Sequence, residues 1–177
     1  MYRSRLGKNL EKVTLDYVSS IDDDVEIAHY DILGSQAHAI MLYENKIITK
    51  NEIKKILKGL ESLKKAKFTK KTDSEDIHEL IESLIIKKIG IGAGGKMHTA
   101  RSRNDQVALD IRMKIRDDIN ITCQCLLDTI KSLVVLAKKH QDTIVPLYTH
   151  LQQAQVGLFS HYLLSYADAL FRDLDRL

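Results

Sequence analysis

The sequence contains one proline and eight glycines among 177 residues, so few positions interrupt regular secondary structure. Only two cysteines occur, Cys123 and Cys125. Two positions apart on a helix, their side chains diverge by about 200°, so they can neither form a disulfide with each other nor chelate one metal together. A chain with so little cysteine is expected in a reducing compartment.

The sequence also lacks a strong excess of charge of one sign. Lys and Arg number 27 against 24 Asp and Glu, which gives a formal net charge of +3. This balance provides no basic groove for nucleic acid and no membrane-facing patch. No uninterrupted apolar run approaches the roughly 20 residues of a membrane span, and no signal-type apolar segment follows the first residues. We therefore expect a soluble, cytoplasmic protein without nucleic-acid or membrane partners.

The remaining composition, 44% hydrophobic and 29% charged, suits a substantial core. Apolar residues recur at spacings of three and four, for example over Ile53–Leu63 and Ile77–Ile85, and no long segment alternates as a strand would. The pattern predicts an all-α fold in which any sheet has at most two short strands. Asn51 and Ser74 are the candidate N-caps of two of these helices.

The longest periodic segment, Val107–Ala137, predicts a helix from about Asp105 to Lys138 that is about 45 Å long. A second apolar stripe, Leu163–Leu177, is still periodic where the sequence ends. Helices of this length usually pack in multi-helix or oligomeric bundles. We therefore expect a helical N-terminal domain over residues 1–88 and, over residues 89–177, the first long helices of a bundle domain that is truncated within a helix.

The segment Gly90–Gln106 breaks the helical pattern and concentrates hydrogen-bond donors. Its glycines let backbone N–H groups face a ligand, and side chains such as Lys96 and Arg101 suit carboxylate or phosphate oxygens. A cradle for an anionic group and a solvated glycine-rich connector both remain open. Residues 90–96 reproduce most of a nucleotide-binding phosphate loop, but Met97 stands where that loop needs a hydroxyl for Mg²⁺, which argues against nucleotide hydrolysis.

Two further segments carry polar side chains suited to chemistry. Pro146–Gln155 lies between two long helical patterns and includes His150, which is either a general acid or base near neutral pH or a satisfied structural histidine. Glu75–His78 places carboxylates and an imidazole in one first helical turn, where acids are also expected from capping alone. The seven histidines show no zinc-type spacing with one another or with the cysteines, so we expect no metal site.

Together these segments resemble the argininosuccinate lyases, a family of the fumarase/aspartase superfamily. The resemblance is carried by Ser19–Ile21, Asp31–His38, Glu75–His78, Gly95–Gln106 and Tyr148–Gln155, in the family's order and approximate spacing. It extends from near Ser4–Gly7 to the end of the chain. The run His98–Gln106 separates this family from its fumarase and adenylosuccinate relatives.

The resemblance implies reversible elimination of argininosuccinate to arginine and fumarate, the last step of arginine biosynthesis. It implies a cytoplasmic homotetramer that needs no cofactor and builds each site from several subunits. It assigns the catalytic histidine to His150. The substrate-binding positions and their neighbours are implied at Ser20, Asn104, Thr149, Arg103, His78 and Gln155. Because elimination builds negative charge on a carboxylate, fixed hydroxyl, amide and backbone N–H donors are the groups that this chemistry requires.

Four residues depart from the family pattern and affect local loop geometry: Leu147 and Ala100 replace glycines, Gln153 replaces an arginine and Val156 replaces a proline. The family's mobile loop, with its serine base, lies beyond Leu177, so we expect the 177-residue chain alone to be inactive. Two interpretations stay open. The chain is the N-terminal portion of a working lyase, or it is a non-catalytic structural or interaction protein resembling the crystallins recruited from this family.

Overall fold

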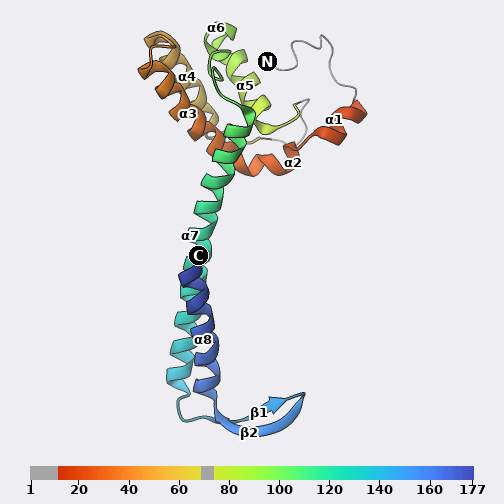
Figure 1. Cartoon of the computed structure of the whole chain (residues 1–177), viewed down its shortest axis with the longest axis vertical. Coiled ribbons are helices and arrows are strands. Elements are labelled where there is room, and N and C mark those ends of the chain that lie inside the picture. Colours follow the sequence, from red (N-terminus) through yellow and green to blue (C-terminus); the bar gives the residue numbers. More distant parts are fainter. Residues whose placement is uncertain (1–11, 69–73) are drawn as a thin grey trace. The chain divides into compact units, whose positions relative to one another are not determined.

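The computed structural model describes residues 12–68 and 74–177, in two compact units, Met1–Lys114 and Ile115–Leu177 (Figure 1). The described part is 72% helical, and its sheet has two short strands. The predicted all-α fold class is thereby confirmed. The division between the units falls within the long helix α7 (Arg103–Lys139), and the domain boundary after residue 88 stays a prediction. Residues 4–7, where the family resemblance begins, lie outside the described residues.

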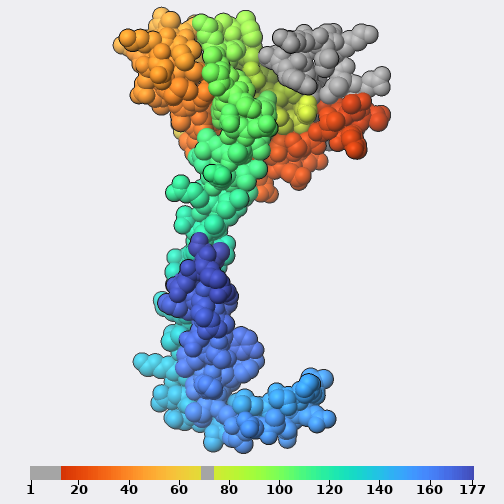
Figure 2. All heavy atoms as spheres, in the orientation of Figure 1, coloured from red at the N-terminus to blue at the C-terminus, as the bar shows by residue number. Residues whose placement is uncertain are grey.

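The N-terminal unit is built from short and medium helices. They are α1 (Lys12–Val18), α2 (Ile21–Asp24), the 3-10 turn η2 (Val25–Ile27), α3 (Ala28–Glu44), α4 (Lys50–Leu63), α5 (Ile77–Ile89) and α6 (Ile91–Gly94), followed by the first part of α7. Helices α3, α4 and α5 contact one another in every pairing, and Figure 2 shows this region as closely packed atoms. Its core therefore lies among these three helices.

The side chains of this core follow the spacing seen in the sequence. The large apolar side chains that are fully buried are Ile32, Leu42, Ile56, Leu60, Ile77, Ile81 and Ile85. On α4 and α5 they recur every four residues, so each helix turns one apolar face inward. Burial of a side chain of this size contributes about 1.5–3 kcal/mol. The core thereby holds α3 and α5, which also carry buried polar residues of the candidate site.

Two helices begin at residues other than those predicted. The Thr49 hydroxyl accepts the Glu52 N–H at 3.4 Å while the Glu52 carboxylate accepts the Thr49 N–H at 2.7 Å, a capping box that starts α4. The Asp76 carboxylate accepts a first-turn N–H of α5 at 2.6 Å. The predicted caps are therefore wrong, because Asn51 lies inside α4 and Ser74 lies two residues before the α5 cap.

Helix α6 packs on α5 through a glycine. A Cβ atom placed on Gly94 would lie 2.9 Å from the Cα atom of Ile86, a distance that Cβ atoms essentially never show. A Cβ atom on Gly92, in the same short helix, would meet nothing within 4 Å. Only the first of these glycines is therefore required by the packing of α6 on α5.

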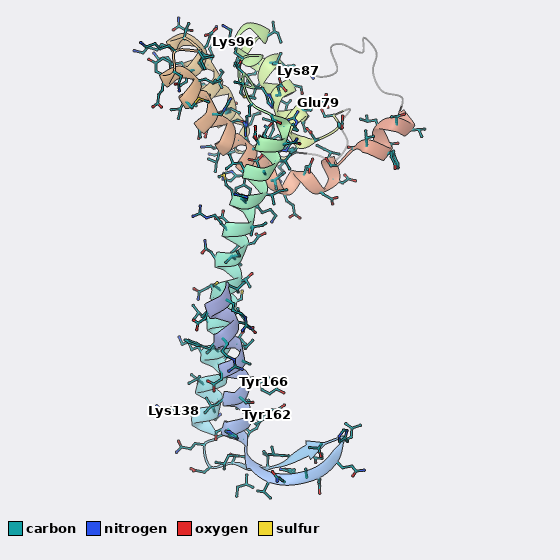
Figure 3. The ribbon with its side chains drawn as sticks, in the orientation of Figure 1. Glu79, Lys87, Lys96, Lys138, Tyr162 and Tyr166 are labelled. Atoms are coloured by element: carbon teal, nitrogen blue, oxygen red, sulfur yellow. The ribbon has the colours of Figure 1, made fainter. Side chains whose placement is uncertain are left out.

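The C-terminal unit contains the second part of α7, a β-hairpin and helix α8 (Phe159–Arg176). The hairpin leads α8 back beside the second part of α7 (Figure 1), and Ala137, Leu163 and Ala167 are buried there. Tyr162 and Tyr166, labelled in Figure 3, lie one turn apart on α8. Their hydroxyl oxygens are 3.2 Å from each other. The predicted long helix agrees with α7 to within two residues at each end, and both cysteines on it are free.

Both long helices expose apolar side chains in this chain. They include Ile111, Ile115, Ile121, Leu127, Val134 and Val135 on α7, and Leu164 and Phe171 on α8. By length and average composition, α7 is apolar enough to cross a membrane, although it contains no long uninterrupted apolar run. Core helices of soluble proteins pass the same test. Ile111, Ile115 and Val134 belong to the stripe that the sequence predicts on α7, whereas Leu164 and Phe171 lie beside the predicted stripe of α8, whose Leu163 and Ala167 are buried.

The polar segment between the long helices forms an antiparallel hairpin of β1 (Ile144–Thr149) and β2 (Gln152–Leu158). Thr149 pairs with Gln152, which leaves His150 and Leu151 as a two-residue turn with φ angles of 51° and 62°. Two positive φ angles in succession are typical of the turns that match strand twist. Residues other than glycine adopt this conformation at a cost of about 1–3 kcal/mol each.

The hairpin also contains a register shift between Pro146 and Tyr148. The intervening Leu147 packs on Gly157, where an added Cβ atom would lie 2.8 Å from a methyl carbon of Leu147. The leucine that departs from the family pattern is therefore accommodated by a glycine on the facing strand.

Candidate active site

The first group of candidate site residues surrounds the start of α7. The Ser102 hydroxyl accepts the Asn104 N–H at 3.1 Å, and the Asp105 carboxylate accepts the Ser102 N–H at 3.2 Å. The Ser102 side chain therefore accepts an N–H of the first turn of α7, and Asp105 in that turn bonds back to the Ser102 backbone. These two bonds fix Arg103, which is half-buried, and Asn104, which is exposed, in the first turn of a long helix. The positive end of the helix dipole at this position favours an anionic ligand.

Arg103 is held by two acceptors of the protein. Its Nε lies 3.2 Å from a carboxylate oxygen of Asp76, and its Nη1 donates to Oε1 of Gln106 at 2.9 Å. A guanidinium carries five N–H donors, and these contacts engage two of them. The side chain is 35% exposed. Arg103 is therefore oriented by the α5 cap and by α7 while part of it faces solvent.

Ser20 joins the same region through its backbone. Its N–H donates to the Glu75 carbonyl at 3.0 Å, and the Ser19 hydroxyl donates to that carbonyl at 3.0 Å. The Ser20 hydroxyl is exposed and donates to the Asp24 carboxylate at 2.6 Å. Residues 75 and 76, which are adjacent in the chain, thus connect Ser20 with the side chain of Arg103.

A buried polar cluster adjoins this region and consists of Asp31, Ser35, His78, Arg101 and Asp110. His78 Nδ1 lies 3.3 Å from Asp31 and 3.5 Å from Asp110, and Arg101 Nη1 donates to the Ser35 hydroxyl at 3.1 Å. Burial and the neighbouring charge of Asp31 raise the pKa of Asp110 to about 7. Burial lowers the pKa of Arg101. The cluster thus groups two carboxylates with a guanidinium and an imidazole. These basic groups limit the free-energy cost of burying the carboxylate charge.

Asp31, His78 and Asp110 also offer a set of ligand atoms that lie within 4.8 Å of one another. Such a set fits a metal ion by distance. The Arg101 guanidinium lies in the same region, because a Cβ atom on Gly34 would meet both Oδ1 of Asp110, at 3.3 Å, and Nη2 of Arg101, at 3.4 Å. Among the described residues, Arg101 Nη2 and both carboxylate oxygens of Asp110 have no hydrogen-bond partner. The expectation that the chain has no metal site stays a prediction.

The N-terminal unit brings together four of the seven predicted site residues. Ser20 and Arg103 meet at the start of α5, and Asn104 follows Arg103. His78 lies in the first turn of α5, and its side chain is fully buried in the cluster. In this chain the His78 ring is therefore covered by protein atoms, whereas the other three residues are at least partly exposed.

The remaining three predicted residues lie in the C-terminal unit, on the hairpin. Thr149 ends β1, His150 opens the turn, and Gln155 lies in β2 near the register shift. All three are exposed. The predicted site residues thus fall into two groups, one in each compact unit.

Two donors that the sequence placed in an anion cradle are engaged elsewhere. Lys96, which Figure 3 labels near α6, pairs with Glu52 at 2.6 Å and is the main reason that the pKa of Glu52 falls to about 2. Arg101 belongs to the buried cluster. The glycine-rich segment therefore acts as a connector anchored on α4, and Arg103 and Asn104 are the donors presented at the start of α7.

Sequence reasoning missed Asp31 and Asp110 of the buried cluster, and Gln106, which donates to Asp31. Gln106 and Asp110 are one helical turn apart and both are buried, which the polarity of their side chains gave no reason to expect. The spacing of four residues was the available signal, because it places both side chains on one face of α7.

Comparison with known proteins gives consistent results over the whole chain. A family model described as Lyase matches residues 5–177. The argininosuccinate lyase of Nitrosopumilus maritimus (strain SCM1) is 71% identical over 177 residues, covering 100% of this chain and 36% of that protein. The argininosuccinate lyase of Methanocaldococcus jannaschii is 45% identical over 178 residues, covering 99% of this chain and 37% of that protein. The chain thus spans little more than a third of the length of these relatives.

Solved structures show the same arrangement of helices. EDDS lyase in complex with formate matches with a TM-score of 0.74 and 30% identity, covering 92% of this chain and 32% of that one. A beta-carboxy-cis,cis-muconate cycloisomerase from Acinetobacter calcoaceticus sp. ADP1 matches with a TM-score of 0.74 and 17% identity, covering 95% and 40%. At the lower identity the likeness concerns the fold alone.

Proposed function

The chain belongs to the lyase family, and on that premise we propose that it forms the N-terminal part of an argininosuccinate lyase. The reaction is the reversible elimination of argininosuccinate to arginine and fumarate. The observation that carries the proposal is the 71% identity, over the whole chain, to a relative of that name. Because the chain spans 36% of that relative, the activity is proposed for the full-length protein that contains it.

The residues around the start of α7 would bind the carboxylates of the substrate. Arg103 keeps N–H donors beyond those engaged by Asp76 and Gln106, and Asn104 adds an exposed amide at the positive end of α7. The exposed hydroxyl of Ser20 donates to Asp24 in this chain and would serve as a third donor after turning from Asp24 to the substrate. These groups suit a reaction whose intermediate concentrates negative charge on one carboxylate, because fixed donors stabilise that charge most strongly where it develops.

His78 would act on the same site without touching substrate. Its ring lies between Asp31 and Asp110 and is fully buried. In this arrangement it holds the first turn of α5 against α3 and α7. The α5 cap, Asp76, contacts Arg103, so His78 supports the orientation of the donors.

The hairpin would supply the proton-handling histidine. His150 stands in the two-residue turn with a positive φ angle, a backbone conformation that persists where the surrounding structure enforces it and that occurs often at functional sites. Imidazole titrates near neutral pH, as general acid–base chemistry requires. Thr149 and Gln155 add exposed donors on the flanking strands.

The assembly would be a cytoplasmic homotetramer whose sites combine segments of different subunits, without a cofactor. The exposed apolar side chains of α7 and α8 support this proposal, since a long apolar stripe needs further helices to cover it.

The test is an assay of the full-length protein for fumarate release, followed by ultraviolet absorbance. Argininosuccinate is the expected substrate, and adenylosuccinate and malate serve as comparison substrates that offer the same dicarboxylate on different leaving groups. Release of fumarate from argininosuccinate alone supports the proposal. A folded, assembled protein that releases no fumarate from argininosuccinate would instead favour the non-catalytic structural role.

A further inference from the structure

Gln106 makes contacts at both ends of its side-chain amide, although it is a buried residue with 2% of its surface exposed. Its Nε2 donates to Oδ1 of Asp31 on α3. Its Oε1 accepts from Nη1 of Arg103 at 2.9 Å and lies 3.1 Å from Nε2 of His98. One amide in the first turn of α7 therefore contacts the buried Asp31 carboxylate on one side and the side chains of Arg103 and His98 on the other.

These partners fix the orientation of the amide. A carboxylate oxygen only accepts hydrogen bonds, so the amide nitrogen must face Asp31. A guanidinium only donates, so the amide oxygen must face Arg103. A flipped amide would place two donors together on one side and two acceptors together on the other. The Gln106 side chain thus has a single orientation that satisfies its neighbours.

The same amide also determines the proton position on His98. Because Oε1 of Gln106 only accepts, Nε2 of His98 must carry a hydrogen in order to bond to it. His98 is half-buried and precedes the α7 cap by four residues. Gln106 therefore sets both the direction of the Arg103 guanidinium and the tautomer of a neighbouring imidazole.

The carboxylate behind Gln106 is itself held in place. Asp31 accepts from the Ser35 hydroxyl at 3.4 Å and lies 3.3 Å from His78 Nδ1, and each of these three side chains is buried. A contact to a carboxylate fixed in this way gives Gln106 little freedom to move. Arg103 is therefore oriented by two acceptors, Asp76 and Gln106, that are both anchored in the N-terminal unit.

We propose that Gln106 is a positioning residue of the lyase site, a role that rests on the proposed function. It does not touch substrate, because it is buried. It holds Arg103 in the orientation in which the remaining N–H donors of the guanidinium face a carboxylate of the dicarboxylate part of the substrate, and it fixes the tautomer of the neighbouring His98. Because its amide is bonded to the fixed Asp31 carboxylate, it holds the half-buried side chains of Arg103 and His98 in place.

A double-mutant cycle in the full-length protein tests this role. The variants are Gln106→Met, which keeps the volume of the side chain and removes both hydrogen-bond partners, Arg103→Ala, and the two combined. We expect Gln106→Met to lower kcat/KM by at least about tenfold, because the oriented guanidinium binds the substrate carboxylate before and during the reaction. In the Arg103→Ala background the same substitution should lower kcat/KM by less than about threefold, because the guanidinium that Gln106 orients is absent.

Two outcomes of the cycle would overturn the proposal. The first is a kcat/KM of Gln106→Met within about twofold of wild type. The second is a double variant whose loss of kcat/KM equals the product of the losses in the two single variants. Gln36→Leu is the matched control, since Gln36 also donates to a carboxylate, that of Glu61 at 3.0 Å, but on the exposed face of α3. If Gln106→Met does not fold, Gln106→Asn replaces it, because the shorter side chain withdraws the amide from the same partners.

Crystal structures of the wild-type protein and of the position 106 variant give a readout that needs no activity. The expected result is that the Arg103 guanidinium turns away from its wild-type position while α3 and α5 keep theirs. An unmoved guanidinium would overturn the positioning role even if the enzyme is active. If the wild-type protein releases no fumarate, the proposed lyase function fails, and the crystal structures still decide whether Gln106 orients Arg103.

Discussion

The Nε atom of Arg103 lies 3.2 Å from a carboxylate oxygen of Asp76, the residue that caps α5. One carboxylate therefore serves two purposes. It accepts a backbone N–H of the first turn of α5 at 2.6 Å, and it orients a side chain proposed to bind substrate.

Asp76→Asn should separate these purposes. The amide oxygen still caps α5, whereas the charge that pairs with Arg103 is lost, and a charge-assisted hydrogen bond is roughly twice as strong as a neutral one. We expect the KM for argininosuccinate to rise at least about tenfold with little change in Tm. Thr49→Ala is the control, since it removes the cap of α4 at a cost of about 1 kcal/mol and should leave KM unchanged. Equal KM effects in both variants would contradict the assignment.

Gly94→Ala should destabilise the protein by about 1–3 kcal/mol, because the new Cβ atom would lie 2.9 Å from the backbone of Ile86 and force α6 off α5. Gly92→Ala is the matched control in the same helix, where open space surrounds the Cβ position. It should be neutral or slightly stabilising. Denaturant unfolding of both variants measures the difference, and similar losses of stability would show that the close approach does not matter.

The raised pKa of Asp110 predicts a specific pH dependence of stability. The folded-state pKa is about 7 against an ordinary value of 3.8, so the folded protein binds more protons than the unfolded chain between these values. The stability from this group is therefore fully present below about pH 4 and is lost as the pH rises through about 7. The groups that face Asp110 are Asp31 on α3, His78 on α5 and Arg101 before α7.

Asp110→Asn should weaken this dependence, because an amide resembles the protonated acid. Relative to wild type, the variant should gain at least about 1 kcal/mol in unfolding free energy between pH 4 and pH 8. Asp142→Asn, at an exposed position, is the control and should follow the wild-type profile. Parallel profiles for wild type and Asp110→Asn would show that Asp110 is ionised throughout this range.

His150→Asn should lower kcat by about 10²–10⁴ and change KM far less, because a residue that moves a proton acts mainly in the transition state. Thr149→Ala and Asn104→Ala should alter both constants, since their donors contact substrate before and during the reaction. His161→Asn, on the exposed part of α8, is the control. A kcat of His150→Asn close to that of wild type would indicate that His150 has a structural role and does not move a proton.

Sites shared between subunits predict complementation. Full-length proteins altered at Asn104 and at His150, which lie in different compact units, should recover partial activity when they are mixed, unfolded and reassembled. Some sites of a mixed tetramer would then receive both intact segments. Mass measurement verifies that mixed tetramers form. A mixture no more active than either parent would indicate that both segments come from one chain.

The helices could be predicted from the sequence because their apolar spacing is regular over many turns, as on α5 and α7. The hairpin could not be predicted in the same way. Its turn contains His150 and Leu151, whereas asparagine and glycine are the usual residues of such a turn. The apolar residues of β1 are consecutive, Ile144 to Leu147, and β2 is mostly polar, so neither sequence alternates between apolar and polar side chains. Its position between two long helices was the only part that the sequence indicated.

The exposed donors Arg103 and Asn104 could be identified because they stand in one recognisable run of residues. The groups that hold them could not. Gln106 and Asp31 are 75 positions apart, and their contact depends on how α3 and α7 pack. The spacing of residues along the chain shows which side chains share a face of one helix. It does not show which side chains of different helices come into contact when the helices pack.

The contact between Asp31 and Gln106 also has a consequence for biosynthesis. While the ribosome is extending the chain, α3 emerges long before α7, and its Asp31 carboxylate has no amide, guanidinium or second carboxylic acid with which to share a buried position. Its partners within α3 and α5 are Ser35 and His78 alone, and burying a charge with few partners is more costly than leaving it in water. The α3–α5 core should therefore reach its full stability only after residues 101–110 have left the ribosome, and shorter nascent chains should more often expose apolar helix faces that chaperones recognise.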